Sequence, residues 1–437
     1  MRNMFYLLNI GVSGIKNIKE EVRLNFYKKT VDKNFNPEKY RIKAIYGENG
    51  SGKSAIITAV KIFQDLIIND NYLSESKTQV FLDEIINKAT RTFQFNCEFL
   101  VNLDTRKIVY NYLVQIGKNE NGLFEVQYET LKMKNGNYAN NRYETIFESK
   151  NGELIHINCA DSVKGKIKKK TMNLLSSHSF INLLLRSKDH MLQDDIFFHI
   201  IMCSVLILII KVYIAEEDQH ELYFLQKRLK ESEIDNQGLT GLLEYGDSMN
   251  IFFGVNEKLV DKKYFPKYKE KISQLTQFIK IFKPDLVSID IDAKENGEQY
   301  ACDLNLNYGD YVINKEFEST GIKKLIRLFD CFMAASTIGI VFIDEMDSNL
   351  NDVYLCKLIE YFMYYGKGQL CFTTHNLDPM TVLKENRNSI DFLSNDNHII
   401  SWTSRGNASP ENCYKNGMIE DSPFNIDATD FVGILGE

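Results

Sequence analysis

The stretch of sequence that decides the fold is Gly47-Glu48-Asn49-Gly50-Ser51-Gly52-Lys53-Ser54, which matches the pattern G-x-x-x-x-G-K-[ST] at every fixed position. A short strand, Arg41–Tyr46, is expected to lead into it, and a helix is expected to continue through Ala55–Ile67. Between them, glycines let the backbone curl so that successive N–H groups and the helix N-terminus face a phosphate. We predict that Lys53 neutralises the β- and γ-phosphates of a nucleotide and that Ser54 ligates Mg²⁺.

A second motif, Gly339–Glu345, is an apolar run that ends in two acids. Such a run is typical of a buried central strand, and ligands of a parallel sheet bind at the carboxyl ends of its strands. We predict that Asp344 holds magnesium through its water shell and that Glu345 orients or deprotonates the attacking water. Ordinary strands also end in acids, so the upstream glycine-rich loop is what favours this interpretation.

Two further segments gain their functional interpretation from these motifs. His375 follows a short apolar run and is placed at a strand end, from which it would hydrogen-bond the γ-phosphate. Ser319 precedes a helical run, Leu325–Ala335, and is expected to cap that helix, with Gly321 permitting close approach. Taken singly, a strand-end histidine is often a packing residue, and a capped helix is commonplace.

Outside the motifs, the sequence predicts a sheet first and helices later. Strand patterns occur at Phe5–Ile10, Glu20–Phe26, Phe93–Val101, Ile108–Ile116 and Leu123–Leu131. Polar or glycine-bearing turns separate the last three, which predicts an antiparallel meander. Between Ser162 and Phe282 the pattern is mostly helical, with amphipathic stretches at Leu222–Ser232 and Lys267–Phe282. Two more strands are expected at Leu286–Asp292 and Tyr300–Asn307. Ile196–Ile210 is shorter than the roughly 18 residues of a membrane-spanning helix, so we interpret it as a buried helix.

Composition narrows the class of protein further. Of the 437 residues, 44% are hydrophobic and 25% are charged, which is typical of a globular chain. The formal net charge of −7 argues against a globally basic nucleic-acid binder. The compact basic run Lys164–Lys170 has two alternative interpretations, a local contact with nucleic acid or an ordinary solvated helix face. The eight cysteines form no C-x-x-C pair, and the N-terminus lacks the features of a signal peptide. We therefore expect a cytoplasmic protein with reduced thiols, no structural zinc and no membrane segment.

The order of these motifs resembles that of the ABC/SMC class of ATPases. The corresponding elements are the Walker A motif at Gly47–Ser54, the signature at Ser319–Lys323, Walker B at Ile340–Glu345, the D-loop at Ser348–Asn351 and the switch histidine at His375. Two signature positions depart from the usual pattern, since Thr320 stands in place of glycine and Ile322 in place of a polar residue. A Q-loop is not evident, and the candidate Ser177–Arg186 contains no glutamine.

This resemblance implies an α/β P-loop NTPase with an ABC/SMC-type head and a mostly helical insertion. The first part of the ATPase domain would span residues 1–160, the insertion 161–283, and the second part 284–437. It further implies ATP and Mg²⁺ as cofactors. It also implies a homodimer or higher oligomer in which the signature of one subunit covers the nucleotide of another.

More narrowly, Glu318–Leu325 and Thr373–Asn376 resemble ATP-binding proteins related to RecF and to OLD-family nucleases. Many of those belong to bacterial anti-phage systems, which implies a separate effector such as a nuclease or toxin. Two alternatives are the ATPase subunit of a transporter and a self-contained OLD-type nuclease. The long stretch between Lys53 and Ser319 disfavours the first, and the lack of a clear acid cluster after His375 disfavours the second.

Overall fold

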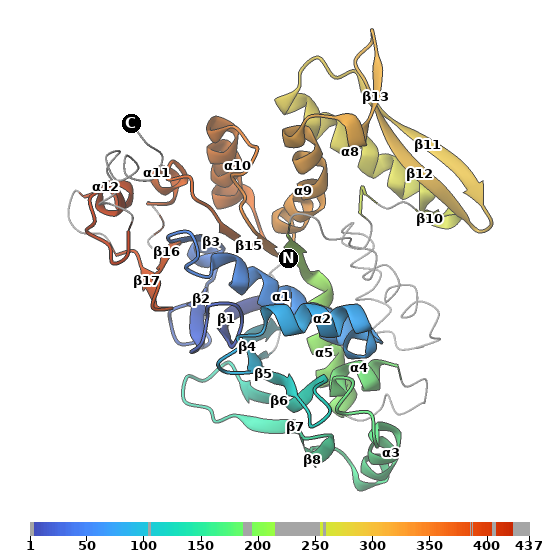
Figure 1. Ribbon diagram of the computed structural model, residues 1–437, viewed down its shortest axis with the longest axis vertical. Coiled ribbons are helices and arrows are strands. Elements are labelled where there is room, and N and C mark those ends of the chain that lie inside the picture. The colour runs from blue at the N-terminus through green and yellow to red at the C-terminus, as the bar shows by residue number, and fades with distance from the viewer. Residues whose placement is uncertain are drawn as a thin grey trace.

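The computed structural model describes residues 4–103, 106–186, 195–214, 254–256, 259–384, 386, 388–403 and 408–422. Within these residues the strands form three sheets, with helices between and around them (Figure 1). The predicted motifs all lie on one of these sheets or on the helices next to it.

The central sheet is mostly parallel. Its order is β17 (Ile399–Ser401), β16 (Ile390–Leu393), β3 (Ile42–Tyr46), β15 (Gln369–Thr373), β14 (Ile340–Ile343) and β9 (Ile210–Tyr213). The strands from β16 to β9 pair in parallel, and β17 pairs antiparallel at the edge. They are buried on both faces, which explains why most of their residues are apolar, and the charged Lys43 of β3 and Asp391 of β16 form a buried ion pair of 2.9 Å. Their carboxyl ends therefore meet at one edge, where the predicted site residues follow.

The second sheet is antiparallel and lies in the first part of the chain. Its order is β2 (Val22–Asn25), β1 (Phe5–Ser13), β4 (Thr92–Asn102), β5 (Lys107–Lys118), β6 (Phe124–Asn135), β7 (Glu144–Lys150) and β8 (Glu153–Ile157). The predicted meander is confirmed, because β4, β5 and β6 pair antiparallel in sequence order. Strands β7 and β8, which were not predicted from the sequence, extend the same sheet.

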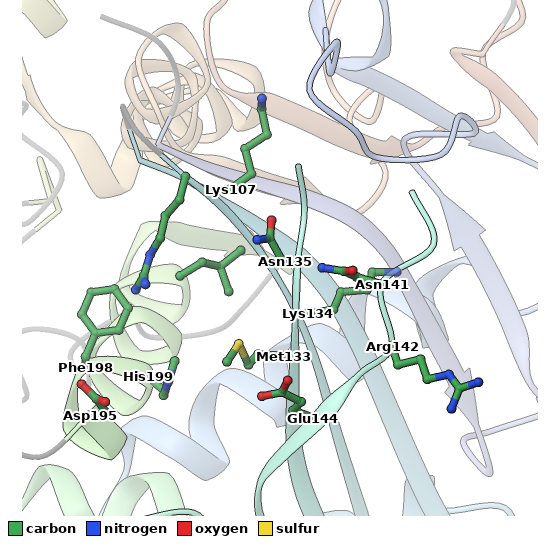
Figure 2. Close-up of a pocket in the computed structure, with 12 residues that line it drawn as sticks. Lys107, Met133, Lys134, Asn135, Asn141, Arg142, Glu144, Asp195, Phe198 and His199 are labelled. Atoms are coloured by element: carbon green, nitrogen blue, oxygen red, sulfur yellow. The ribbon is translucent and has the colours of Figure 1, made fainter. Parts of the chain in front are cut away.

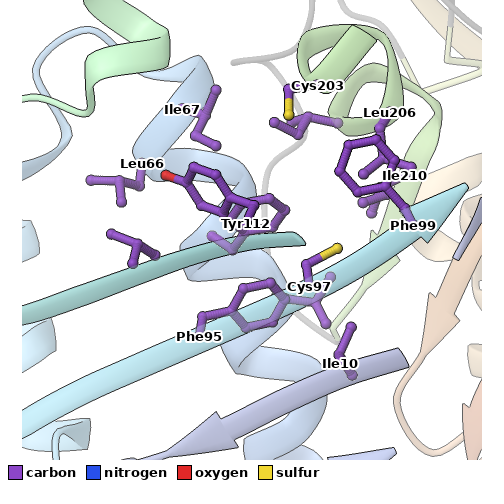
Figure 3. Packing of buried hydrophobic residues seen from close by; sticks show 14 of the residues in the cluster. Ile10, Leu66, Ile67, Phe95, Cys97, Phe99, Tyr112, Cys203, Leu206 and Ile210 are labelled. Carbon is purple, nitrogen blue, oxygen red and sulfur yellow. The ribbon is translucent and has the colours of Figure 1, made fainter. Parts of the chain in front are cut away.

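Helix α1 (Lys53–Ile68) is enclosed between these two sheets. Its buried residues share one core with the antiparallel sheet and with one face of the central sheet. Phe63 of α1 stacks on Phe95 with ring centroids 4.6 Å apart, and Figure 3 shows Leu66 and Ile67 of α1 beside Tyr112 in the same core. Burying each such side chain contributes ~1.5–3 kcal/mol. The core thus fixes the helix whose first residues carry the glycine-rich loop.

The opposite face of the central sheet is covered by α9 (Thr320–Ser336) and α10 (Asp352–Tyr365), and α8 (Phe265–Phe282) packs against α9 in the same second core. A third, small antiparallel sheet adjoins α8 and has the order β10 (Leu259–Asp261), β12 (Gln299–Asn307) and β11 (Ser288–Asn296), with β13 (Val312–Asn314) paired to β12. A buried ion pair of 2.7 Å between Lys271 and Asp330 joins α8 to α9. This layer holds the predicted signature segment.

The remaining helices complete the two layers. They are α2 (Ser76–Ile85), α3 (Asp161–Thr171), α4 (Phe180–Leu185), α5 (Asp195–Ile209), α11 (Pro379–Leu383) and α12 (Pro410–Lys415), with single 3₁₀ turns at Glu38–Tyr40, Tyr72–Ser74, Lys262–Tyr264 and Lys315–Phe317. In the described residues no helix is both long enough and apolar enough to cross a membrane.

The predicted helical insertion, residues 161–283, also contributes to the central sheet. The apolar run Ile196–Ile210 is a buried helix as predicted, but the chain then continues as β9, which pairs with β14. This strand was not predicted, because the apolar run of the helix continues into its first residue, Ile210, and only the pairing with β14 marks where the strand begins. The amphipathic stretch Leu222–Ser232 lies outside the described residues.

Candidate nucleotide-binding site

The glycine-rich loop leaves β3 at Tyr46 and curls around the start of α1. Gly47, Gly50 and Gly52 have φ values of +155°, +84° and +108°, which side chains with a Cβ rarely adopt. A Cβ on Gly47 would lie 2.5 Å from the Leu393 carbonyl oxygen. The curl therefore requires glycine, and it leaves α1 without a side-chain cap at its N-terminus.

Lys53 is buried inside this loop. Its ammonium donates to the carbonyl oxygens of Gly47, at 2.8 Å, and Glu48, at 2.7 Å. Burial lowers the pKa of Lys53, while the nearby carboxylates of Asp344 and Glu345 oppose that shift. A cation is thus held in place beside the uncapped N–H groups of a helix, a pairing that suits a phosphate chain.

The loop also contains a buried polar atom that a bound nucleotide would satisfy. The hydroxyl of Ser51 is fully buried and has no hydrogen-bond partner among the described residues. Asn17 donates to the carbonyl oxygen of Gly50 at 2.7 Å and Asn395 donates to Glu48 at 2.8 Å, so both sides of the loop are tied down. Lys53 and Ser54 form the first turn of α1, where a phosphate and its magnesium would be held.

The two acids at the end of β14 are organised by Thr373 of β15. The Thr373 hydroxyl donates to Asp344 at 2.5 Å and accepts from the backbone N–H of Glu345 at 2.7 Å. Glu345 has φ +48°, and the left-handed region costs a residue with a Cβ ~1 kcal/mol. One hydroxyl therefore fixes both acids, and the chain bears local strain at the position of the predicted base.

His375 lies at the same edge, after β15. Its backbone N–H donates to Asp347 at 3.3 Å, as does that of Asn376 at 3.2 Å. The pKa of His375 is lowered, first by burial and then by the positive charge of Lys53. These hydrogen bonds and the parallel pairing of β3 with β15 place the histidine, the acids and the start of the glycine-rich loop at one edge of the sheet.

Ser319 and Gly321 lie at a different place on this edge, at the start of α9. The Ser319 hydroxyl accepts from the Ile322 N–H at 3.4 Å, which confirms the predicted cap. A Cβ on Gly321 would lie 2.8 Å from the Asn349 carbonyl oxygen, so glycine here allows α9 to approach the D-loop segment. Thr320, the departure from the usual signature, donates to the Asn349 side chain at 3.5 Å.

An open cavity of about 390 Å³ surrounds Ser319. The end of α8, the start of α9, the D-loop segment, the start of α10 and the residue before β13 line it: Phe282, Lys283, Tyr311, Glu318, Gly321, Ile322, Leu325, Asn349, Leu350, Asn351 and Tyr354. Among the described residues, the glycine-rich loop contributes nothing to this lining. One chain therefore presents the loop and the signature as separate surfaces.

The candidate Q-loop, Ser177–Arg186, lies at the wrong end of α1. Asn182 donates to the Ile67 carbonyl oxygen at 2.8 Å and Arg186 pairs with Asp70 at 2.8 Å, both near the C-terminus of α1. A 16-residue helix is ~24 Å long, so this segment is far from Lys53. The Asp344 N–H instead donates to the Tyr213 carbonyl oxygen at 3.0 Å, which brings the end of β9 to the site.

A second cavity, of about 560 Å³, lies between β5, β6, β7 and α5 (Figure 2). Its lining includes four cations, Arg106, Lys107, Lys134 and Arg142. Lys107 donates to the Lys33 carbonyl oxygen, and Figure 2 shows Lys107 and Arg142 pointing away from the centre. With Glu144 and Asp195 also in the lining, the charges near its centre are balanced, and this cavity is not a concentrated anion site.

The basic run Lys164–Lys170 lies on α3, where Ile167 anchors the helix and Lys166, Lys168 and Lys169 are exposed. Figure 1 shows α3 at the opposite end of the molecule from α10 and α11. The lysines are therefore remote from the nucleotide site and favour the solvated-face interpretation.

The fold and the site define an α/β P-loop NTPase with the motif order of ABC/SMC-class ATPases. Residues 42–183 match a protein-family model described as an AAA domain, putative AbiEii toxin, of a type IV TA system. The chain matches no curated protein. Among the solved structures it resembles is the recombination mediator protein RecF-ATPrS of the RecFOR pathway, at 14% identity and a TM-score of 0.40, over 92% of this chain and 99% of that one.

Several residues of the site were not singled out from the sequence. Thr373 and Asp347 are the hydrogen-bonding partners that hold Glu345 and the His375 backbone. Lys324 donates to the D-loop segment from within α9. For Thr373 the available signal was a polar residue at the end of an apolar run, whereas Lys324 follows Lys323 and does not stand out in the sequence.

Proposed function

We propose that this chain is a Mg²⁺-dependent ATPase whose active sites are each completed by a second copy of the chain. The observation that carries the proposal is the separation of its two nucleotide-facing surfaces. The glycine-rich loop, Glu345 and His375 lie together, whereas Ser319 opens onto its own cavity. A symmetric pair would bring the signature of each subunit over the loop of the other.

The residues at the loop side support in-line attack of water on the γ-phosphate. Ser54 and Asp344 would hold Mg²⁺, which when bound neutralises charge on the β- and γ-phosphates. Lys53 holds the phosphate chain, and Glu345 accepts the proton of the attacking water as the bond between the γ-phosphorus and the bridging oxygen breaks. His375, whose pKa is lowered, donates or accepts at the γ-phosphate as a neutral imidazole.

The ATP cycle would act as a switch for a separate effector in a bacterial anti-phage or DNA-maintenance system. The family description, which names a toxin–antitoxin system, supports a defence setting. All eight cysteines are free thiols, which supports a reducing, cytoplasmic compartment. An adjacent nuclease-like or toxin-like reading frame would support this output, and an adjacent permease would support the transporter alternative instead.

Mixing two inactive variants tests the composite site. Lys53→Ala removes the phosphate-binding cation, and Ser319→Arg places a bulky side chain where the signature meets ATP. Each homodimer should be inactive. A heterodimer keeps one intact site, with its loop from the Ser319→Arg subunit and its signature from the Lys53→Ala subunit. ATPase activity should therefore return in part on mixing, with heterodimers verified by two affinity tags.

Glu345→Gln assigns the restored activity to one subunit. Placed on the Ser319→Arg subunit it should abolish the restored turnover, and placed on the Lys53→Ala subunit it should leave that turnover unchanged. If tagged heterodimers form without any return of activity, either Ser319 acts within its own subunit or the two sites turn over only as a pair.

A self-contained nuclease is the alternative that a simple incubation tests. Among the described residues, no group of three or more His, Cys, Asp or Glu side chains is arranged to hold a metal ion. We expect the pure chain to leave plasmid DNA intact with ATP and either magnesium or manganese. Cleavage that co-elutes with the protein on a column would favour the nuclease instead.

A further inference from the structure

Lys324 connects the signature helix to the catalytic loop of its own subunit. It lies in α9, five residues after the Ser319 cap, and its side chain is 5% exposed. The ammonium donates to the Glu345 carbonyl oxygen at 2.5 Å, to the Ser348 carbonyl oxygen at 2.8 Å and to the Ser348 hydroxyl at 2.5 Å. All three donor positions of the ammonium are used on one short segment.

This burial is costly and needs compensation from the segment that Lys324 holds. Burial lowers the pKa of Lys324 to about 8, against the opposing effect of Asp347, Glu345 and Asp344. A buried ammonium is stable in a fold only when its donors are satisfied. The three acceptors meet that need, so the position of Lys324 and the conformation of residues 345–348 depend on each other.

Glu345 is held from both sides of its strained backbone. On the N–H side it donates to Thr373, and on the carbonyl side it accepts from Lys324. Its left-handed φ of +48° persists only where neighbours fix it. Thr373 anchors Glu345 to the central sheet, whereas Lys324 anchors it to the helix whose first turn carries Ser319 and Gly321.

We propose that Lys324 is a positioning residue, which sets the geometry of Glu345 for hydrolysis and makes that geometry depend on the signature helix of the same subunit. The inference rests on the proposed ATPase function. Contact of Ser319 with nucleotide on the partner would then reach the subunit's own glutamate through α9 and Lys324. The two ATP sites of a pair would be coupled within each subunit by this one side chain.

Lys324→Met tests the inference, because methionine fills the volume of the lysine stem without donating. Misplacing a catalytic group by ~1 Å lowers turnover by up to ~100-fold, so we expect kcat to fall by ~10- to 100-fold. KM and the calorimetric affinity for ATP should stay within about threefold of wild type, since Lys324 does not contact the glycine-rich loop. Lys357→Met is the control, because Lys357 lies on the exposed face of α10 outside all the motifs and pairs with Glu360 at 2.7 Å.

Ser348→Ala provides the second variant, since it removes one of the three acceptors and leaves the fold of α9 intact. It should lower kcat by a smaller factor, about two- to fivefold, as expected for one hydrogen bond. In the Lys324→Met background the same change should have no further effect, because the two residues act through one contact.

The outcomes separate this inference from the proposed function. The same assay includes wild-type protein and Glu345→Gln. Equal ATP turnover in these two samples would contradict the proposed ATPase function itself. Wild-type kcat in Lys324→Met overturns the inference alone. If Lys324→Met loses ATP affinity as well, Ser348→Ala decides: reduced kcat with normal affinity supports the positioning role, and unchanged kcat overturns it.

Discussion

Helices α1 and α9 both begin at the carboxyl edge of the central sheet, yet their N-termini differ. The first turn of α1 follows a glycine with φ +108°, has no side-chain cap and contains the buried Lys53. The first turn of α9 is capped by Ser319, which is exposed beside an open cavity. Both ends have the positive end of a helix dipole, but only the start of α1 adds uncapped N–H groups and a buried cation for an anion.

That difference indicates distinct roles for the two ends. At α1 the N–H groups are left uncapped beside a fixed cation, so this end can hold a phosphate chain by itself. At α9 the cap already uses the Ile322 N–H, and the nearby Lys324 ammonium is turned inward to Glu345 and Ser348. The signature end is therefore suited to complete a site whose phosphate is held elsewhere.

Lys53→Ala should have the largest effect, because it removes the feature that most separates the two ends. We expect no saturable ATP binding by calorimetry and no turnover, since the loop would hold a highly charged phosphate chain without a charge-assisted partner. Lys61→Ala is the control, because Lys61 is on the same helix but pairs with Asp65. Unchanged ATP affinity in Lys53→Ala would contradict the assignment of the loop.

Glu345→Gln should leave binding intact and stop the reaction. We expect kcat to fall by ~100-fold or more, as for a lost general base, while calorimetric affinity is retained. The ATP-bound dimer should then accumulate on a sizing column. Glu360→Gln on the exposed face of α10 is the control. Turnover near that of wild type would mean that another group activates the water.

Thr373→Val should have an intermediate effect on the loop side alone. Valine keeps the shape of threonine but removes the hydroxyl that orders Asp344 and Glu345. We expect kcat to fall by ~10-fold through misplacement of both acids, with ATP affinity reduced by less. Thr130→Val is the matched control, because that buried hydroxyl donates to the Phe147 carbonyl oxygen, at 2.9 Å, in the antiparallel sheet, away from the predicted site residues. Equal effects in both variants would indicate a general loss of stability.

The sequence predicted the loop side better than the signature side, for a physical reason. Gly47–Ser54 is a local motif, because its conformation follows from its own glycines and from the strand and helix that flank it. The fixing of Glu345 depends instead on Thr373 and Lys324, which are distant in sequence and meet only when β15 and α9 pack beside β14. Strand β9 was missed for the same reason, since pairing with β14 makes it a strand.

Ser319 variants should have the smallest effect, and they separate capping from contact with a nucleotide. Loss of an N-cap costs ~1 kcal/mol with alanine but only a few tenths with glycine, so urea unfolding should find Ser319→Ala less stable than Ser319→Gly.

If the hydroxyl served only as a cap, kcat would follow the same ranking, with Ser319→Gly close to wild type. We expect kcat to fall by a similar factor of roughly two to ten in both variants instead, as expected for the loss of one hydrogen bond worth about 0.5–1.5 kcal/mol. Ser409→Ala, which removes the cap of α12, should lower stability without lowering kcat. A wild-type kcat in Ser319→Gly would show that the Ser319 hydroxyl acts only as a helix cap, and the contrast between the two helix ends would then lie in Gly321 and its approach to Asn349.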